Sequence, residues 1–195
     1  AATVFGARVG SLLLDESLTY KELNGAVNRF ASGLQKMGVK KGERVAIMLP
    51  NCPQFIIAAY ATWRIGAIVV CCNPLYVPRE IEYLINDSGA GTFVVMSSLY
   101  ERVKGIRKNT CLKRVIVTNI KEYFPASLKM LFSLTREKKE GHRVDISDDM
   151  ETYRFQNIMT ISPDMPEAVD IKPDDASTLI YTSGTTGKPK GAQHT

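Results

Sequence analysis

The densest set of chemistry-bearing side chains in the sequence lies in residues 181–191, which read YTSGTTGKPKG. Serine and threonine hydroxyls donate hydrogen bonds, glycine lets backbone N–H groups turn toward an anion, and lysine adds positive charge. The apolar residues 178–181 lead into this run and predict a buried strand that holds its root. The pattern therefore predicts a loop that cradles phosphate. The residues that supply its donors, bends and charges are Ser183, Gly184, Thr185, Thr186, Gly187, Lys188 and Lys190.

This loop differs from the two common phosphate-binding motifs. A Walker loop requires G-x-x-x-x-G-K-[ST] with a helix that opens at the lysine, yet the fifth residue after Gly184 is Pro189 and the fifth after Gly187 is Ala192. The dinucleotide fingerprint G-x-G-x-x-G does not fit either. Because Pro189 disfavours helical geometry at Lys188, the loop is expected to stay extended. A solvated surface turn of the same composition is the alternative that these residues leave open.

The order YTSGTTGKPKG resembles, at all eleven positions, the phosphate-binding signature of the acyl-adenylate-forming (AMP-binding) superfamily. That superfamily includes the acyl-CoA synthetases, firefly luciferase and the adenylation domains of peptide synthetases. The resemblance continues upstream in residues 18–23 (LTYKEL), 42–46 (GERVA), 73–80 (NPLYVPRE) and 84–90 (LINDSGA). Residues 73–80, and the GHRV run at 141–144 in a long insert, look most like the long-chain fatty-acid–CoA ligases. Medium-chain and aryl-CoA ligases share much of this sequence.

The resemblance implies a two-step reaction with ATP, Mg²⁺, a fatty acid and CoA. The acid's carboxylate attacks the α-phosphorus of MgATP, and the CoA thiol then displaces AMP from the acyl-adenylate. Residues 182–190, with Thr182 now included, are expected to hold the triphosphate, where donors and lysines offset the charge that grows on pyrophosphate. In this family the catalytic lysine, the adenine pocket and the magnesium-holding carboxylate lie downstream of the loop. We therefore expect an N-terminal part with no catalytic residue of its own, which is inactive alone.

Two other classes of function remain open at this stage. One is a non-catalytic module that binds a nucleotide or a lipid through the same loop, and the other is a phosphotransferase with an atypical phosphate loop. An acid–CoA ligase for medium-chain or aryl acids is the alternative within the superfamily.

The composition is typical of a globular domain, and the charge favours some kinds of binding partner over others. The sequence is 45% hydrophobic and 23% charged with a net charge of +5, which suits an anionic ligand. Nucleic acid is not expected as a partner, because basic residues are dispersed among acidic ones. The four cysteines show no C-x-x-C spacing, so we expect no metal site and a reducing, cytoplasmic location. A homodimer and peripheral contact with a membrane are further hypotheses.

Periodicity along the chain predicts alternating helices and strands. A capping box at Thr19 and Glu22 begins one helix, which Gly38 ends, and Pro53 and Pro78 open two more. Apolar runs at 45–49, 67–71, 92–96 and 114–118 recur at strand–helix intervals. This rhythm predicts an α/β fold with a layered, largely parallel sheet and helices on both faces. The resemblance implies the large N-terminal domain of an acyl-CoA synthetase-like fold.

Three segments follow from these patterns: an α/β subdomain at 1–118, a polar insert or exposed linker at 119–173, and a strand with the phosphate loop at 174–195. Apolar residues at 128–134 lie beside basic residues at 129–139 within the insert. This stretch is either a basic amphipathic element that touches a membrane or a short surface helix that packs on its own domain.

Overall fold

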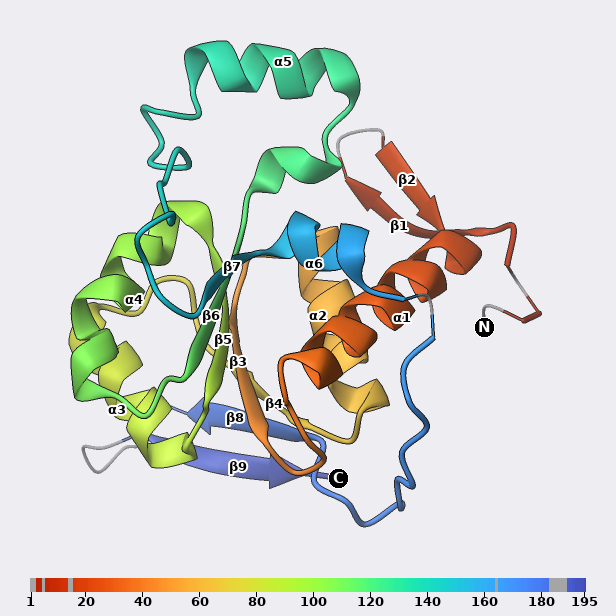
Figure 1. The fold of residues 1–195 in the computed structure, drawn as a ribbon, viewed down its shortest axis with the longest axis vertical. Helices are drawn as coiled ribbons and strands as arrows, with labels where there is room; N and C mark the ends of the chain where they lie inside the picture. Colours follow the sequence, from red (N-terminus) through yellow and green to blue (C-terminus); the bar gives the residue numbers. More distant parts are fainter. Residues whose placement is uncertain (1–2, 5, 14–15, 164, 183–188) are drawn as a thin grey trace.

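The computed structural model describes residues 3–4, 6–13, 16–163, 165–182 and 189–195 (Figure 1). Within these residues a two-stranded hairpin, β1–β2, stands beside a seven-stranded sheet of order β7-β6-β5-β3-β4-β8-β9. In chain order the elements are β1 (Val9–Leu13), β2 (Glu16–Thr19), α1 (Tyr20–Lys36), β3 (Arg44–Met48), α2 (Pro53–Arg64), β4 (Ile68–Cys71), α3 (Pro78–Ser88), β5 (Thr92–Met96), α4 (Tyr100–Ile106), β6 (Arg114–Thr118), α5 (Ala126–Thr135), β7 (Thr152–Arg154), α6 (Phe155–Ile161), β8 (Thr178–Thr182) and β9 (Lys190–His194).

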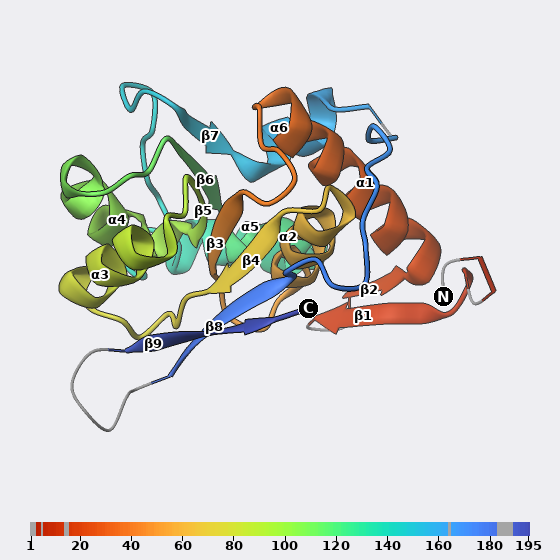
Figure 2. The same ribbon diagram turned by 90° about the horizontal axis from the view of Figure 1, so that it is seen from below.

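The sheet is parallel from β7 to β8, and only β9 runs antiparallel to its neighbour. Alternate residues of β3 enter two separate cores, Val45 and Ile47 on one face and Ala46 and Met48 on the other. Helices α1, α2 and α6 cover the first face, while α3 and α4 cover the second, as Figure 2 shows. Since both faces are covered, the central strands are continuous apolar runs, and the predicted layered α/β fold is confirmed.

Helix α1 begins where the sequence predicts. The backbone N–H of Thr19 donates to Glu22 Oε2 at 2.9 Å, and the N–H of Glu22 donates to Thr19 Oγ1 at 3.2 Å. This reciprocal pair is a capping box, which satisfies backbone donors that the first turn leaves free. The helix ends at Lys36, and Gly38 follows it with a φ of +82°, a left-handed conformation that glycine adopts without strain.

The prediction of a buried strand before the phosphate loop is wrong for β8. Leu179 and Tyr181 pack against the core beneath α3, but Ile180 faces the opposite side and is 43% exposed. The cause is position, because β8 lies next to the edge strand β9, whose five residues are all exposed. The described residues therefore cover β8 on one face only.

The segment 119–173 contains more structure than the expected polar insert or exposed linker. Strand β7 pairs in parallel with β6, and α6 places Phe155 and Ile158 in the core beside α1. The ring of Phe155 stacks on Phe30 with centroids 4.3 Å apart. Helix α5, by contrast, stands above the sheet and apart from both helical layers (Figure 1). The division into 1–118, 119–173 and 174–195 remains a proposal.

Candidate functional site

The expected phosphate loop joins β8 to β9 at the rim of the sheet. Thr182 ends β8, Lys190 begins β9, and the two are paired in the antiparallel register. Both are exposed. The other expected site residues lie outside the described residues, namely Ser183, Gly184, Thr185, Thr186, Gly187 and Lys188.

The loop leaves the sheet at its carboxyl edge. Strand β8 is parallel to β4, with Cys71 opposite Ile180, so Thr182 exits on the side where β4 also ends. Ligands of open α/β sheets bind beyond this edge. After the loop the chain continues as the strand β9, whereas a Walker loop continues as a helix. The described geometry thus agrees with a phosphate loop of another type.

Both sides of the loop contact helix α3, which sequence reasoning did not foresee. The hydroxyl of Tyr181 donates to Asp87 Oδ2 at 2.6 Å, and the hydroxyl of Tyr83 donates to the carbonyl oxygen of Pro189 at 3.0 Å. Burial and then the hydrogen bond to Asp87 raise the pKa of the Tyr181 phenol. The sequence signal that could have indicated this contact is the four-residue spacing of Tyr83 and Asp87, which puts both side chains on one face of a helix.

A second feature of the carboxyl edge is an apolar pocket of about 800 Å³ at the ends of β3, β4, β5 and β6. The chain adds β4 on one side of β3 and β5 on the other, so the pocket lies at the switch point of the sheet. Its wall includes Met96, Leu99 and Phe132, and Arg102 and Arg136 also line it. The guanidinium of Arg102 donates to the carbonyl oxygens of residues 74 and 76, which fixes the loop after β4.

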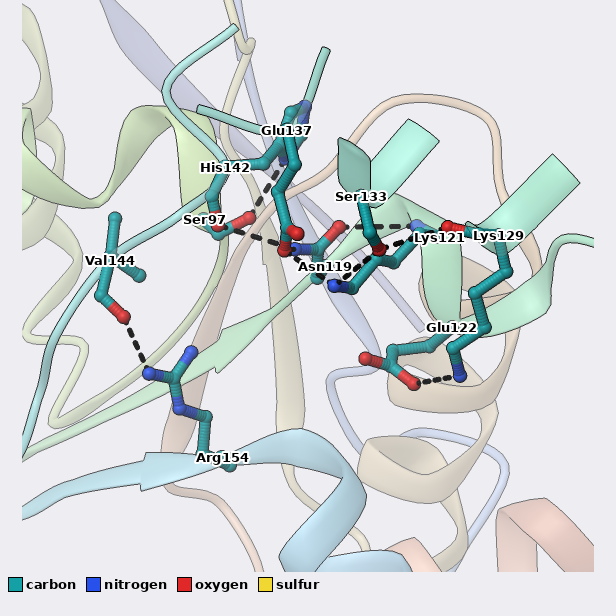
Figure 3. A network of polar contacts seen from close by, with 10 residues as sticks. All are labelled: Ser97, Asn119, Lys121, Glu122, Lys129, Ser133, Glu137, His142, Val144 and Arg154. Carbon is teal, nitrogen blue, oxygen red and sulfur yellow. Dashed lines mark hydrogen bonds and ion pairs between the residues drawn. The ribbon is translucent and has the colours of Figure 1, made fainter. Parts of the chain in front are cut away.

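A polar network lies beneath α5 (Figure 3), and one of its members, His142, also lines this pocket. The side-chain amide of Asn119 donates to Glu137 Oε1 at 2.9 Å and to the carbonyl oxygen of His142 at 3.2 Å. Lys121 Nζ lies 2.6 Å from the same Glu137 oxygen. These contacts join the two ends of the chain segment that carries α5, and their role is structural.

The described residues offer little for metal or thiol chemistry. Among them, no group of three or more His, Cys, Asp and Glu side chains lies close enough to hold a metal ion. Burial, and to a lesser extent Cys71 and Glu80, raises the pKa of the Cys72 thiol to about 12, so the reactive thiolate is disfavoured. None of the helices in the described part of the chain combines the length and apolar character needed to cross a bilayer.

A mainly parallel sheet whose central strands are covered on both faces gives the chain a layered α/β architecture. Open sheets of this kind bind ligands beyond their carboxyl edge, where the candidate loop begins. Comparison with known families then identifies the family. Residues 3–195 match the model of the AMP-binding enzyme family, and the chain belongs to this family.

Three relatives show the extent of the similarity. The long-chain-fatty-acid–CoA ligase of Bacillus subtilis is 32% identical over 186 residues, a match that covers 92% of this chain and 32% of that protein. The crystal structure of a long-chain-fatty-acid-CoA ligase from Archaeoglobus fulgidus matches 100% of this chain and 35% of that chain, with a TM-score of 0.75 and 29% identity.

The third is the crystal structure of an anthranilate CoA ligase in complex with anthranoyl-AMP. The match covers 98% of this chain and 32% of that chain, with a TM-score of 0.80 and 23% identity. At this identity the likeness concerns the fold alone. The chain thus spans about a third of the length of the relatives that it matches.

Proposed function

We propose that this chain is the N-terminal part of an ATP-dependent fatty-acid–CoA ligase. The observation that carries the proposal is the eleven-residue run 181–191, whose described ends at Thr182 and Lys190 lie at the carboxyl edge of the sheet, in a chain that belongs to the AMP-binding enzyme family. Similarity to ligases named for long-chain fatty acids supports the choice of acid. ATP, CoA and a fatty acid are the proposed partners.

The proposed chemistry has two steps, and this chain serves the first. The oxygen of the fatty-acid carboxylate bonds to the α-phosphorus of ATP while the bond to pyrophosphate breaks, which gives the acyl-adenylate. The thiol sulfur of CoA then attacks the acyl carbon and releases AMP. Negative charge grows on the departing pyrophosphate, so donors fixed around it lower the barrier. Thr182 and Lys190, exposed at the two ends of the loop, are the described residues proposed for this role.

Other requirements of the reaction fall outside the chain under this proposal. Mg²⁺ is expected to arrive with the triphosphate and to be held by residues beyond position 195. The catalytic lysine, the adenine pocket and most of the acyl site are expected there too. These 195 residues alone are therefore proposed to be inactive.

Peripheral contact with a membrane is a second part of the proposal, and α5 supports it. Met130, Leu131 and Leu134 are 68%, 56% and 74% exposed, and Lys138 and Lys139 follow the helix without an ion-pair partner among the described residues. Apolar side chains beside free cations suit the surface of an anionic bilayer. Retention on anionic liposomes tests this contact. A cytoplasmic location and a homodimer remain hypotheses, and size-exclusion chromatography with light scattering tests the latter.

Exchange of labelled pyrophosphate into ATP by the intact protein tests the main proposal. Long-chain, medium-chain and aryl acids are compared in parallel with a reaction that contains no acid. Exchange that depends on a long-chain acid supports the proposal, and exchange with an aryl acid instead changes the acid class. Absence of exchange with every acid contradicts ligation, and transfer of the γ-phosphate to an acceptor would indicate a phosphotransferase.

A further inference from the structure

Helix α3 contacts the chain on both sides of the phosphate loop. Before the loop, the Tyr181 hydroxyl donates to Asp87; after it, the Pro189 carbonyl accepts from Tyr83. Tyr83 and Asp87 are four residues apart on the helix, so they lie on the same face one turn apart. One rigid element thus reaches both ends of a loop whose described ends, Thr182 and Lys190, are cross-strand partners.

These contacts act where the sheet no longer supports β8. The ladder between β4 and β8 ends at the pair Cys71 and Ile180, so Tyr181 and Thr182 extend past it. From there β8 pairs only with the edge strand β9, and an isolated two-stranded ribbon is marginally stable in water. The bonds to α3, together with the packing of Tyr181 against the core, can therefore fix the direction of the hairpin at the loop.

The hydrogen bond from Tyr181 to Asp87 has the geometry of a strong contact. Its length of 2.6 Å falls in the range of hydroxyl donors to ionised carboxylates. The hydroxyl of Tyr83 also lies 3.5 Å from Asp87 Oδ1, but the Pro189 carbonyl oxygen at 3.0 Å is its closer acceptor. Each tyrosine thus anchors a different side of the loop.

Gly191 provides independent support for the placement of the Tyr181 ring. The two residues are opposite each other in the ladder between β8 and β9. A Cβ atom at Gly191 would lie 3.1 Å from Cζ, 3.3 Å from Cε2 and 3.4 Å from the hydroxyl oxygen of Tyr181. The ring therefore lies across the backbone of β9 in space that a side chain at position 191 would fill, and from there its hydroxyl reaches Asp87.

We propose that Tyr83 and Asp87 are positioning residues, through which α3 holds both ends of the phosphate loop in the arrangement that receives the triphosphate. The proposal rests on the proposed function, since it assigns α3 to the ATP-dependent step. A loop whose ends are fixed before ATP arrives loses less conformational freedom on binding, so ATP binds more tightly. The acid and CoA gain no such benefit from these contacts.

Kinetics of the intact protein test this inference. We expect Tyr83→Phe, Asp87→Asn and Tyr181→Phe each to raise the KM for ATP roughly three- to tenfold. The KM values for the acid and for CoA are expected to stay unchanged. Tyr181→Phe removes the hydrogen bond to Asp87, and Asp87→Asn weakens it because a neutral amide oxygen replaces the carboxylate. Their double variant should therefore resemble Tyr181→Phe alone, whereas Tyr83→Phe should add to Tyr181→Phe. Tyr60→Phe and Asp148→Asn are matched controls, because neither exposed side chain forms a hydrogen bond or ion pair with another described residue.

Hydrogen exchange separates this inference from the proposed function. In the three variants, amides of residues 178–182 and 190–194 should exchange faster, while those of β3 and β5 keep the exchange rates of the wild type. Wild-type KM values together with unchanged hairpin exchange would overturn the inference and leave the ligase assignment intact. An equal rise in all three KM values would also overturn it, since that indicates general damage. If the wild type lacks acid-dependent exchange of pyrophosphate, the proposed function fails, and hairpin exchange alone decides whether α3 anchors the loop.

Discussion

The hydroxyl oxygen of Ser97 lies 2.8 Å from Nδ1 of His142, although the two residues are 45 positions apart (Figure 3). Ser97 directly follows β5, and His142 follows the segment that carries α5, so this contact fastens that segment to the end of the sheet. The imidazole also meets the ring of Phe132 edge-on, with centroids 5.5 Å apart. Burial lowers the pKa of His142, an effect that Glu140 and Glu137 oppose only in part. The fold therefore favours the neutral imidazole.

Stability is predicted to fall as the pH drops below 6.5, the ordinary pKa of histidine. Above this pH His142 is neutral in both states; below it the unfolded chain takes up a proton that the folded chain resists, which favours unfolding. The loss grows until the pH reaches the lower pKa of the folded state. Thermal unfolding between about pH 5 and 7.5 measures this loss of stability. The range is chosen because it lies above the ordinary pKa values of carboxylates.

A variant without this imidazole should lose less stability over the same range. We expect a flatter pH profile for His142→Gln, while His194→Gln, at an exposed position of β9, controls for the loss of a histidine. Parallel profiles for the wild type and His142→Gln would show that the buried imidazole does not contribute.

The stacked pair Phe30 and Phe155 gives a prediction about the segment first expected to be a linker. Phe155 is fully buried, so Phe155→Ala should lower the free energy of unfolding by roughly 3–5 kcal/mol through the cavity it leaves. Urea unfolding of the intact protein measures the change. Ile161→Ala, at the 73% exposed end of the same helix, is the control and should stay within about 0.5 kcal/mol of the wild type. Equal effects of the two substitutions would mean that α6 does not hold β7 against the core.

Local chemistry explains which elements the sequence predicts. The capping box of Thr19 and Glu22, and Gly89 with its φ of +67° after α3, act within one helical turn, so their signals are visible in the sequence. The central strands are apolar because both faces are covered. In contrast, β7 has three half-buried residues and β9 is wholly exposed, so neither carries an apolar pattern. Their stability comes from pairing with β6 and β8, which the sequence does not specify.

The same distinction applies to the candidate site. Hydroxyls, glycines and lysines between 182 and 190 are types that can bind phosphate, and their exact order, which resembles the acyl-adenylate-forming signature, predicts that they do so. The contact of Tyr181 with Asp87 spans 94 positions and that of Tyr83 with Pro189 spans 106. Such contacts depend on how β8 lies against α3, which follows from the order and twist of the strands. Sequence reasoning thus finds the groups that could bind the ligand, and the fold is needed to find those that hold them.

Substitution of a loop glycine tests the assignment of residues 182–190 to the triphosphate. Gly184→Val adds a branched side chain where the backbone is expected to approach phosphate, so acid-dependent exchange of pyrophosphate should fall at least about a hundredfold. Gly105→Val on α4 is the matched control, because a Cβ there meets nothing within 4 Å. If Gly184→Val exchanges pyrophosphate at the rate of the wild type, the assignment of the loop to the triphosphate is refuted, whichever acid is used.

The exposed apolar residues of α5 lead to a prediction about membranes. A variant with Met130→Ser, Leu131→Ser and Leu134→Ser should lose most of its retention on anionic liposomes, because these side chains would enter the interface. Reversing two exposed cations, in Lys138→Glu with Lys139→Glu, should weaken binding about tenfold or more, and added salt should reproduce part of that loss. Ile161→Ser, on another helix and 73% exposed, controls for the loss of any surface hydrophobe. If a protein lacking 126–139 is retained as well as its parent, α5 is a surface helix that packs only on its own domain.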